Sequence, residues 1–497
     1  MTSTRPTSTR LRVADTLDRL PVTRTHLRVV VAVGLGLFFD MYEVFLAGTI
    51  SSALKTQFGL GGLALSLLLG SAFFGMFLGA AFVARLADRI GRRTMFLLSL
   101  TWYSLWSLVG AFSPNAAVLV ACRFLAGIGV GAEYPVSDTY LSDVLPARAR
   151  GRLAAWAYTC SYLAVPALGF LSLSIADKAP WGVDGWRWLL ALGAIGAVLV
   201  LVLRRGLPES PRWLEAVGRH REAEAALAQF STAAPLRRQP VEAVTPAGSG
   251  STGSVVSGGS VISGGPVISG AGGGAEGGAR PEAAGADPGL GARARLPIGA
   301  LRRAPYRGRL VMLGIFHLLQ TFGYYGFGTL AVLVLAERGY TVQHSLLYTA
   351  LSFLGYPLGS LLSIPLISRI ERKYLIVGSV LTMAAVGLLF ATAAAPLTVV
   401  LAGVAFTTVS NVFSNAYHVY QAEIFPTELR ASATGWTYSL SRLTTGLMPF
   451  LLLPLLHDAG PAAVFTVVAG AMLIVAADVA LLGPRTSARS VEDLNPR

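Results

Sequence analysis

Five ionisable residues interrupt long apolar runs of this sequence, and they are the residues best placed to do chemistry. Asp40 and Glu43 share one run, Arg123 and Glu133 share another, and Arg442 lies in a third. A charge at the centre of a bilayer costs from roughly 3 to over 10 kcal/mol, so such residues usually have a function. Arginine stays protonated, so Arg442 needs an acid or an anionic ligand. The acids outnumber the arginines by one, and the surplus acid is a natural proton carrier, because desolvation favours a protonated carboxyl group.

The same residues also permit a purely structural interpretation. Asp40 and Glu43 are three positions apart and therefore share one helical face, where they could pack as a polar pair. Arg123 and Glu133 could form ion pairs inside a helix bundle. Both alternatives stay open from the sequence.

Polar side chains recur at three- and four-residue steps in two other apolar runs. In the tenth run they are Thr407, Asn411, Ser414, Asn415 and His418, and in the seventh they are His317, Gln320, Tyr324 and Tyr325. Such stripes predict either contacts to a ligand or interhelical hydrogen bonds, which are worth only about 0.6 to 2 kcal/mol each. His418 lies near the end of its run, and we expect it to be an interfacial histidine.

The elements that must position these residues are membrane helices. The chain has 497 residues, 53% of them hydrophobic, and only 13% charged, where a soluble domain has roughly 25%. Its mean hydropathy is +0.59. The two cysteines, Cys122 and Cys160, lie inside apolar runs and have no metal-ligand spacing, which excludes a disulfide framework and a metal centre built on them.

Apolar runs of about 20 residues predict twelve spans and hence an all-α membrane protein. They lie at about 27–53, 62–83, 94–113, 116–141, 152–174, 187–204, 309–336, 346–368, 374–394, 396–420, 431–455 and 461–483. The organisation expected is a polar tail (1–26), a six-helix half (27–204), a loop (205–308), a second six-helix half (309–483) and a tail (484–497). The first tail has no apolar core of a signal peptide, so we expect the first span to be retained.

The basic residues predict the orientation. On one side of the membrane we find only Lys55, Lys178, Arg187 and Arg338, whereas the side of the termini has arginine clusters in several loops. By the positive-inside rule both termini are cytoplasmic, in an inner or plasma membrane. The net charge of +14 is therefore assigned to topology, and no nucleic-acid partner is expected.

The central loop has two parts. Residues of about 210–230 predict an amphipathic surface helix with Ser210 as N-cap and Pro211 at its first position. Residues of about 231–296 are rich in Gly, Ser, Ala and Pro, which is typical of a flexible linker. A partner-binding segment is the alternative.

A duplication is visible at a constant offset of 280 residues. Tyr140-Leu-Ser-Asp143-Val-Leu-Pro146 recurs as Tyr420-Gln-Ala-Glu423-Ile-Phe-Pro426, and the basic loop at 89–93 recurs at 369–373. Six spans per unit is an even number, so the two copies enter from the same side. This is the plan of transporters with a site between two parallel repeats.

Three further motifs carry a family resemblance. They are the loop Leu86-Ala-Asp88-Arg89-Ile-Gly-Arg92-Arg93, the fourth-span residues Arg123, Gly127, Gly129 and Gly131, and Pro208-Glu209-Ser210-Pro211-Arg212-Trp213-Leu214. With them, the chain resembles the major facilitator superfamily along nearly its whole length, in the branch of sugar porters and organic-acid:proton symporters. Asp40-Met-Tyr-Glu43 also resembles the Asp-Gly-x-Asp signature of aromatic-acid:proton symporters.

The resemblance implies roles for individual residues. Asp40, Glu43 and Glu133 would serve proton coupling, and Arg442 would bind a substrate carboxylate. Other candidates for substrate contact are Arg123, which could instead hold an acid, together with Gln320, Tyr324, His317, Asn411 and Asn415.

A cytoplasmic charge network would hold the inside closed. Its members would be Asp88, Arg89, Arg92, Arg93, Asp143, Arg150, Glu209, Arg212, Glu423 and Arg430. We expect Asp88 to pair with Arg148 or Arg150, Glu423 with Arg430, and Glu209 and Arg212 to tie down the surface helix. In the second copy of the loop, Ser368 stands in place of the acid and Glu371 in place of the glycine. Whether the second half has a matching charge network therefore stays open from the sequence.

The function that these features predict is secondary transport of a small organic anion, including aromatic monocarboxylates, with protons as the coupling ion. A sugar or polyol is the alternative, although only Gln320 is present of the sugar porters' seventh-span Gln-Gln pattern. Phosphate transport and a non-transporting receptor remain further alternatives. No catalytic or phosphate-binding motif indicates an enzyme. We expect no cofactor or metal, a lipid bilayer and a small molecule as partners, and a monomer.

Overall fold

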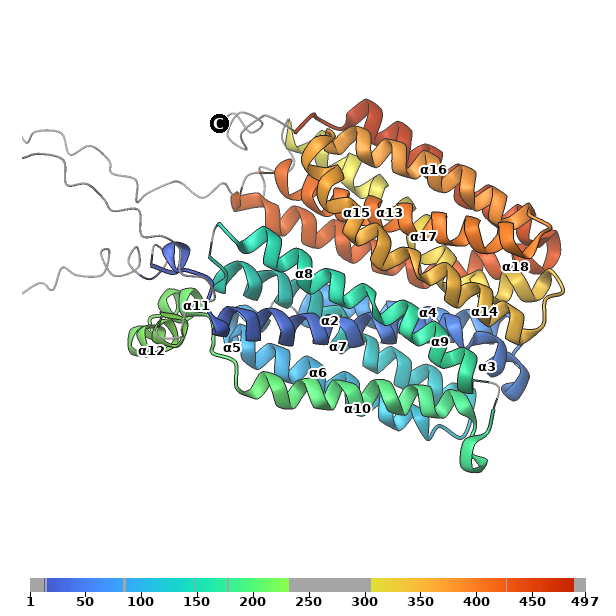
Figure 1. Ribbon diagram of the computed structural model, residues 1–497, viewed down its shortest axis with the longest axis horizontal. Coiled ribbons are helices and arrows are strands. Elements are labelled where there is room, and N and C mark those ends of the chain that lie inside the picture. Colours follow the sequence, from blue (N-terminus) through green and yellow to red (C-terminus); the bar gives the residue numbers. More distant parts are fainter. Residues whose placement is uncertain are drawn as a thin grey trace, which may run out of the picture. The chain divides into compact units, whose positions relative to one another are not determined.

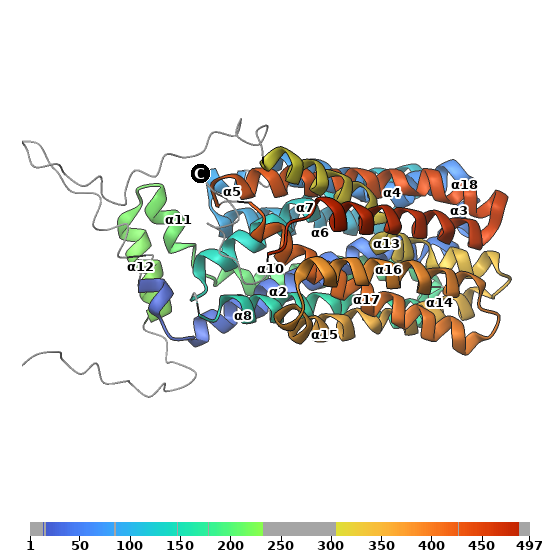
Figure 2. The ribbon, with the colours of Figure 1, turned by 90° about the horizontal axis from the view of Figure 1, so that it is seen from above.

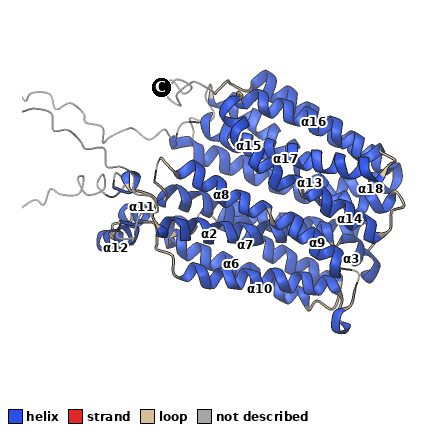
Figure 3. Ribbon diagram, viewed as in Figure 1, coloured by secondary structure: helices blue, strands red, loops and turns tan. Residues whose placement is uncertain are grey.

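The structure is a computed structural model that describes residues 13, 16–83, 86–146, 148–176, 178–231, 305–425 and 427–486, without the side chains of 427–432. The linker predicted at about 231–296 lies almost wholly outside the described residues, as do the first twelve residues and the end of the second tail. Every element described is helical (Figure 3).

The first half contains six spans. They are α2 (Arg24–Thr49), α4 (Gly62–Leu78) continued by the π-helical turn η1 (Gly79–Val83), α6 (Arg92–Ala111), α7 (Ala116–Val144), α8 (Arg150–Tyr162) with α9 (Ala164–Ile175), and α10 (Gly185–Arg205). Short helices join them: α3 (Ser51–Phe58), α5 (Ala87–Ile90) and η3 (Pro180–Gly182).

The second half repeats this plan. Its helices are α13 (Tyr306–Glu337), α14 (Val342–Phe353) with α15 (Gly355–Arg369), α16 (Arg372–Thr392), α17 (Pro396–Glu423) and α18 (Thr427–Leu482). Gly460 interrupts α18 with φ of 78°, so this element holds two spans. The twelve predicted spans are thereby confirmed, and α6 and α7 begin 280 residues before α16 and α17.

Two spans are broken at their middle by proline. Leu163 separates α8 from α9 and Leu354 separates α14 from α15, and Pro166 and Pro357 follow three residues later. Proline cannot donate to the carbonyl four residues back and its ring clashes with that carbonyl. Each span therefore bends one turn before its proline.

The surface helix differs from its prediction. It forms two helices, α11 (Pro211–Ala216) and α12 (His220–Ser231), because Gly218 takes a left-handed φ of 84° between them. Ser210 caps α11 as predicted, its side chain accepting from the Trp213 amide. Both helices lie at the end of the bundle where α2 begins and α18 ends, here called the termini side (Figures 1 and 2). The other end is called the opposite side.

The two halves touch through helices that are far apart in sequence. α4 packs on α18, α9 on α14, and α2 on α13. Glycine permits two of these contacts, because a Cβ at Gly70 would lie 2.3 Å from the Gly446 carbonyl oxygen and one at Gly48 would lie 2.8 Å from that of Gly328. Gly48 lies at the opposite-side end of α2, whereas Gly70 lies at the middle of α4.

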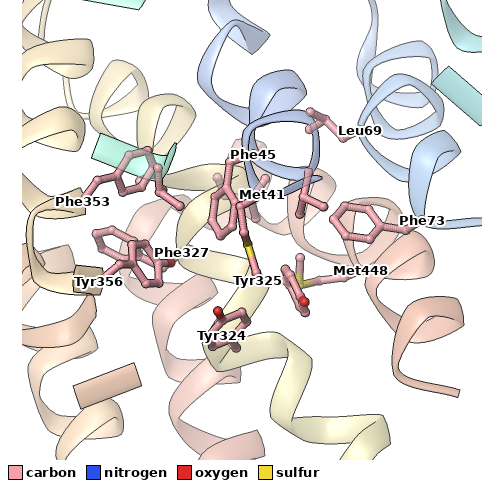
Figure 4. Close-up of a cluster of buried hydrophobic side chains, with 14 of the residues drawn as sticks. Met41, Phe45, Leu69, Phe73, Tyr324, Tyr325, Phe327, Phe353, Tyr356 and Met448 are labelled. Atoms are coloured by element: carbon pink, nitrogen blue, oxygen red, sulfur yellow. The ribbon is translucent and has the colours of Figure 1, made fainter. Parts of the chain in front are cut away.

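An aromatic cluster fills the space between the halves (Figure 4). It draws Phe45 from α2 and Phe73 from α4 against Tyr325 of α13, with ring centroids 6.4 and 5.5 Å from the tyrosine ring. Phe45 also meets Phe353 and Tyr356 at 5.9 and 5.5 Å. The cluster makes one apolar core from both halves.

Candidate functional site

The first buried charge pair joins α2 to α7. Arg123 donates to a Glu43 carboxylate oxygen at 2.6 Å and to the Glu43 backbone oxygen at 3.1 Å. Only 4% of the Arg123 side chain and 3% of the Glu43 side chain are exposed. The guanidinium is thus held by an acid, one of the two roles predicted for Arg123.

The second pair joins α7 to α10 and includes a residue that the sequence did not single out. Arg204 binds Glu133, and Ser99 donates to the other Glu133 oxygen at 2.7 Å. Arg204 also donates to the Ala32 backbone oxygen at 3.1 Å and lies over the Phe96 ring at 4.6 Å. Both side chains of the pair are fully buried.

Arg204 was missed because it stands beside Arg205 at the end of a span, where arginine ordinarily sets topology. One glycine of α2 gives a weak indication of the place that Arg204 takes. A Cβ at Gly36 would lie 1.7 Å from the Arg204 guanidinium, so the glycine makes room for this side chain.

Asp40 is the acid left over in the first half. It is fully buried, and among the described residues neither carboxylate oxygen has a hydrogen-bond partner. Glu133, Arg204 and Glu43 are its charged neighbours. Two acids and two arginines are already paired around it, so Asp40 is the buried acid of this group without an ion-pair partner. The sequence count of three acids against two arginines did not include Arg204.

Arg442 lies in the second half and forms no hydrogen bond with any of these acids. Its guanidinium donates to the Tyr325 hydroxyl at 2.5 Å and to the Tyr438 hydroxyl, and it lies 4.9 and 4.6 Å from the two ring centroids. Within the described part of the chain, no carboxylate comes within ion-pair distance of Arg442. Its charge is therefore solvated by tyrosines alone.

More tyrosines surround this arginine from both halves. Tyr162 of α8 stacks on Tyr356 of α15 with centroids 6.5 Å apart and planes 8° apart. Tyr324 packs edge-on against Tyr325 at 4.7 Å and against Tyr356 at 6.1 Å (Figure 4). The Tyr356 hydroxyl and Gln320 Oε1 are buried without a partner among the described residues. The site thus offers one cation, flat aromatic walls and unused polar atoms.

A chain of hydrogen bonds runs from this site toward the termini side. His317 Nε2 lies 3.1 Å from Gln421 Oε1, and Gln421 Nε2 lies 3.2 Å from His418 Nδ1. His317 is fully buried, whereas His418 is exposed. His317 therefore contacts α17 here and not an open space.

Most of the polar stripe on α17 holds helices together. Thr407 donates to the Ser352 carbonyl at 2.5 Å, Asn411 to the Tyr356 carbonyl at 2.5 Å, and Asn415 to the Ser363 hydroxyl at 2.8 Å. These bonds tie α17 to α14 and α15. For Asn411 and Asn415 the geometry thus matches the interhelical alternative, and a substrate contact stays a prediction.

Comparison with known proteins decides the family. Residues 30–268 match the family model described as Sugar (and other) transporter, and residues 313–495 match that of the Major Facilitator Superfamily. The chain belongs to the major facilitator superfamily. It is a multi-pass membrane transporter of this superfamily and not an enzyme.

Several relatives in the superfamily are similar over nearly the whole chain. The putative metabolite transport protein YyaJ of Bacillus subtilis is 28% identical and the niacin transporter NiaP of Acinetobacter baylyi 26% identical, each over 96% of this chain and 96% and 98% of their own. The 4-hydroxybenzoate transporter PcaK of Pseudomonas aeruginosa is 33% identical over 42% of this chain and 46% of its own.

A solved structure shows the same fold. The crystal structure of a D-xylose-proton symporter superposes with a TM-score of 0.66 at 19% identity, covering 93% of this chain and 99% of that one.

The signature loop of the superfamily is tied together on the termini side. Asp88 pairs with Arg92 at 2.8 Å, and Arg92 with Asp143 at 3.5 Å. The predicted partners of Asp88 were Arg148 or Arg150, so that pairing is wrong: Arg92, one helical turn away, is the nearer base. Arg89 is exposed.

Glu209 anchors the segment after α10 to this loop. Its carboxylate accepts from the backbone amides of Arg92 and Arg93 at 3.0 and 3.1 Å. Gly91 allows this approach, since a Cβ there would lie 2.4 Å from Glu209 Oε2. Arg93 in turn donates to the Arg205 carbonyl. Glu209 thus ties down the surface helices as predicted.

Asp18 takes the remaining arginines of the network. It lies 2.9 Å from Arg150 and 2.7 Å from Arg212. The N-terminal segment was not considered as a gate element, and its acid brings these two bases together beside α11.

The second half has an ion pair that corresponds to Arg92–Asp143 of the first half. Arg372 pairs with Glu423 at 3.4 Å, at the positions 280 residues after Arg92 and Asp143. Glu371 accepts from the Thr486 amide at 3.0 Å, so the residue that replaces the glycine of the loop has a role of its own. The side chain of Arg430, the predicted partner of Glu423, lies outside the described residues.

The described residues contain no group of His, Cys, Asp and Glu that could hold a metal ion.

The conformational state of the transporter follows from the contacts between its halves. On the opposite side Gly48 lets α2 meet α13 and Lys55 reaches Glu337 at 4.0 Å, while Gly70 and the aromatic cluster join the halves nearer the middle of the spans. On the termini side Asp138 and His418 are exposed. The structure is closed on the opposite side.

Proposed function

We propose that this transporter carries a small organic anion with a carboxylate group and an aromatic ring, coupled to protons, by alternating access. One observation carries the proposal: Arg442 is buried and bonded only to tyrosine hydroxyls among the described residues. A buried charge needs a partner, and a substrate carboxylate would form the paired hydrogen bonds that a guanidinium favours. The tyrosine rings around it suit a flat ring.

The names of two relatives support an aromatic acid. One is a niacin transporter and the other a 4-hydroxybenzoate transporter, and both compounds have a carboxyl group on a ring. Arg442 would hold the carboxylate, and Tyr324, Tyr325 and Tyr356 would contact the ring.

Asp40 would carry the proton. An unpaired carboxylate without hydrogen-bond partners is costly in an apolar interior, so Asp40 can exist there neutral and release its proton only when the halves rearrange. Glu43 and Glu133 would keep Arg123 and Arg204 neutralised around it. In this role they position the proton site instead of moving the proton.

The experiment is a thermal-shift assay on the purified protein with niacin, 4-hydroxybenzoate, D-xylose and inorganic phosphate. A ligand at 100 times its Kd stabilises by about 2.7 kcal/mol. We expect an aromatic acid to stabilise the wild type and not Arg442→Gln, with Arg442→Lys as the control that keeps the charge but not the paired geometry. Stabilisation of both proteins by an acid would move its site away from Arg442.

A sugar is the second candidate. The first half matches the sugar transporter model, and Gln320 presents a buried, unpartnered amide oxygen among the described residues. In that case D-xylose would stabilise the wild type and Arg442→Gln alike. Phosphate binding or a receptor without transport would appear as stabilisation by phosphate alone, or as binding without uptake.

For localisation we propose an inner or plasma membrane with the termini side cytoplasmic. The arginines of the signature loop and of α11 lie on that side, as the positive-inside rule requires. A monomer in a lipid bilayer, with the proton as coupling ion and no nucleic-acid partner, completes the proposal.

A further inference from the structure

Asp138, which has no place in the site already described, and His418, the last residue of its hydrogen-bond chain, stand at matching places in the two repeats. Asp138 of α7 and His418 of α17 are separated by the repeat offset of 280 residues, and both are exposed. Asp138 is six residues before the end of α7 and His418 five before the end of α17, which puts each roughly 8 to 9 Å inside its helix end.

Their exposure has to be to water. A carboxylate at this depth would be expensive against lipid tails, so Asp138 faces a wet space inside the protein. Its electrostatic neighbour Tyr438 belongs to α18 of the other half, so Asp138 looks across the gap between the halves. Arg442, the hydrogen-bond partner of Tyr438, is an electrostatic neighbour of His418. Asp138 on the first half and His418 on the second are therefore both electrostatic neighbours of the Arg442–Tyr438 pair.

Hydrogen bonding fixes which nitrogen of His418 is free. Gln421 Oε1 accepts from His317 Nε2, so the Gln421 amide group donates to His418 Nδ1. A neutral His418 then carries its proton on Nε2, and this N–H is available to an acceptor. The other titratable groups around His418 are His317 of α13, Arg442 of α18 and its own neighbour Tyr417.

Symmetry says where an acceptor could come from. The halves of such transporters are related by an axis along the membrane normal and rock against each other. Residues at equivalent positions that face this axis approach each other when their side closes. Asp138 is a carboxylate acceptor and His418 a donor, so they are complementary where two identical residues would repel.

We infer that Asp138 and His418 form the latch of the alternate state, in which the termini side is closed and the opposite side open. His418 Nε2–H donates to the Asp138 carboxylate in that state, and in the present one the two are apart and wet. The inference rests on alternating access in the proposed function but not on the substrate.

Cross-linking tests the approach directly. In a full-length protein with Cys122→Ser and Cys160→Ser, the pair Asp138→Cys and His418→Cys should form a disulfide with a mild oxidant, or react with a short bismaleimide. The matched control is Thr139→Cys with Val419→Cys, also 280 residues apart but rotated about 100° around the same helices. Equal cross-linking of both pairs, or none at 138 and 418, would overturn the latch.

A second experiment measures what the latch does to the equilibrium. Spin labels at Lys55→Cys and Glu337→Cys, on the same cysteine-replaced background, report the opening of the opposite side. Asp138→Ala and His418→Ala should each lower the open-to-closed ratio about ten-fold, the shift that one hydrogen bond to a charged group supplies.

The double alanine variant should lower the ratio no further than either single variant, because both remove the same bond. Asp138→Asn, whose amide oxygen can still accept, should recover most of the ratio. Additive effects of the two alanines would show two independent residues and reject the latch. Neither experiment needs a transported substrate, so a wrong substrate class leaves both results intact.

Discussion

At the scale of single residues, the molecule treats its buried charges in two ways. In the first half the arginines are consumed: Arg123 holds Glu43 and Arg204 holds Glu133, which leaves Asp40 without a partner among the described residues. In the second half Arg442 has tyrosine partners and no acid among those residues. One half therefore has a spare acid and the other a spare base. Proton and anion sites would thus be separated.

Asp40→Asn tests the spare acid. No hydrogen bond is lost, so the melting temperature should stay within about 2 °C of the wild type or rise, because a desolvated ionisable group becomes a neutral amide. Accumulation of substrate driven by an imposed proton gradient should vanish, while exchange of labelled for unlabelled substrate persists. Gradient-driven accumulation at the wild-type level would remove Asp40 from the proton path.

Glu133 and Arg204 give the opposite expectation for stability. Glu133→Gln alone leaves a buried guanidinium without its counter-charge and should destabilise by about 3 to 5 kcal/mol. The double variant Glu133→Gln with Arg204→Met removes both charges and should recover most of that loss. Thermal unfolding in detergent measures both. A double variant as unstable as the single one would show that packing around Arg204, including Phe96, outweighs the ion pair.

At the scale of helices, hydrogen bonds between neighbouring spans occupy most of the polar stripe on α17. Thr407, Asn411 and Asn415 donate hydrogen bonds to α14 and α15, the two helices of a span that proline bends. The helical stripe on α17 is real, but its members have different partners. Helical spacing gives the face of a helix and not what that face meets.

Asn411→Ala separates these roles. The substitution removes a bond to the Tyr356 carbonyl and should lower stability by about 0.6 to 2 kcal/mol, with an unchanged apparent affinity for substrate. Tyr325→Phe is the contrasting variant: it removes one of the two hydroxyls that bond Arg442, so it should weaken apparent affinity as well as lower stability by about 1 to 3 kcal/mol. Uptake kinetics together with thermal unfolding distinguish them, and a large KM effect at Asn411 would restore it as a substrate contact.

At the scale of the whole molecule, the contacts between the halves set the conformational equilibrium. Gly48 lets backbones of the two halves meet on the opposite side and Gly70 lets them meet at mid-span, and the aromatic cluster of Figure 4 packs between the halves. On the termini side, by contrast, the latches Arg92–Asp143 and Arg372–Glu423 each lie within one half. These two ion pairs stiffen the half in which each of them lies, and neither prevents the halves from rocking against each other.

Gly70→Ala should shift this equilibrium. Its Cβ would lie 2.3 Å from the Gly446 carbonyl oxygen, a distance that forces α4 and α18 apart. The state open on the opposite side should gain population, seen as a longer distance between spin labels at Lys55→Cys and Glu337→Cys. Gly62→Ala, where nothing lies within 4 Å of the new Cβ, is the control. An equal shift in both variants would trace the effect to helix propensity instead of the contact.

The sequence by itself determined the spans and the repeat, because bilayer thickness fixes span length, and it located most of the buried charges, because charges in lipid are rare enough to count. Its count of one surplus acid omitted Arg204, and with that residue the three predicted acids stand against three buried arginines. It also indicated the residues of the loop network. The ion pairs predicted from the sequence were partly wrong, since Asp88 pairs with Arg92 and Arg150 pairs with Asp18. Arginines in loops have several acids within reach along the sequence, and only the folded distances show which acid is the partner.

Only the tertiary structure decided which charges are paired. Arg204 reaches Glu133 across helices that are about 70 residues apart in sequence, through space made by Gly36, and that contact makes Asp40 the unpaired acid. The sequence counts charges, but the pairing depends on which helix faces touch. Those faces are chosen by packing between segments far apart in the chain, and this packing leaves no periodic signal in the sequence.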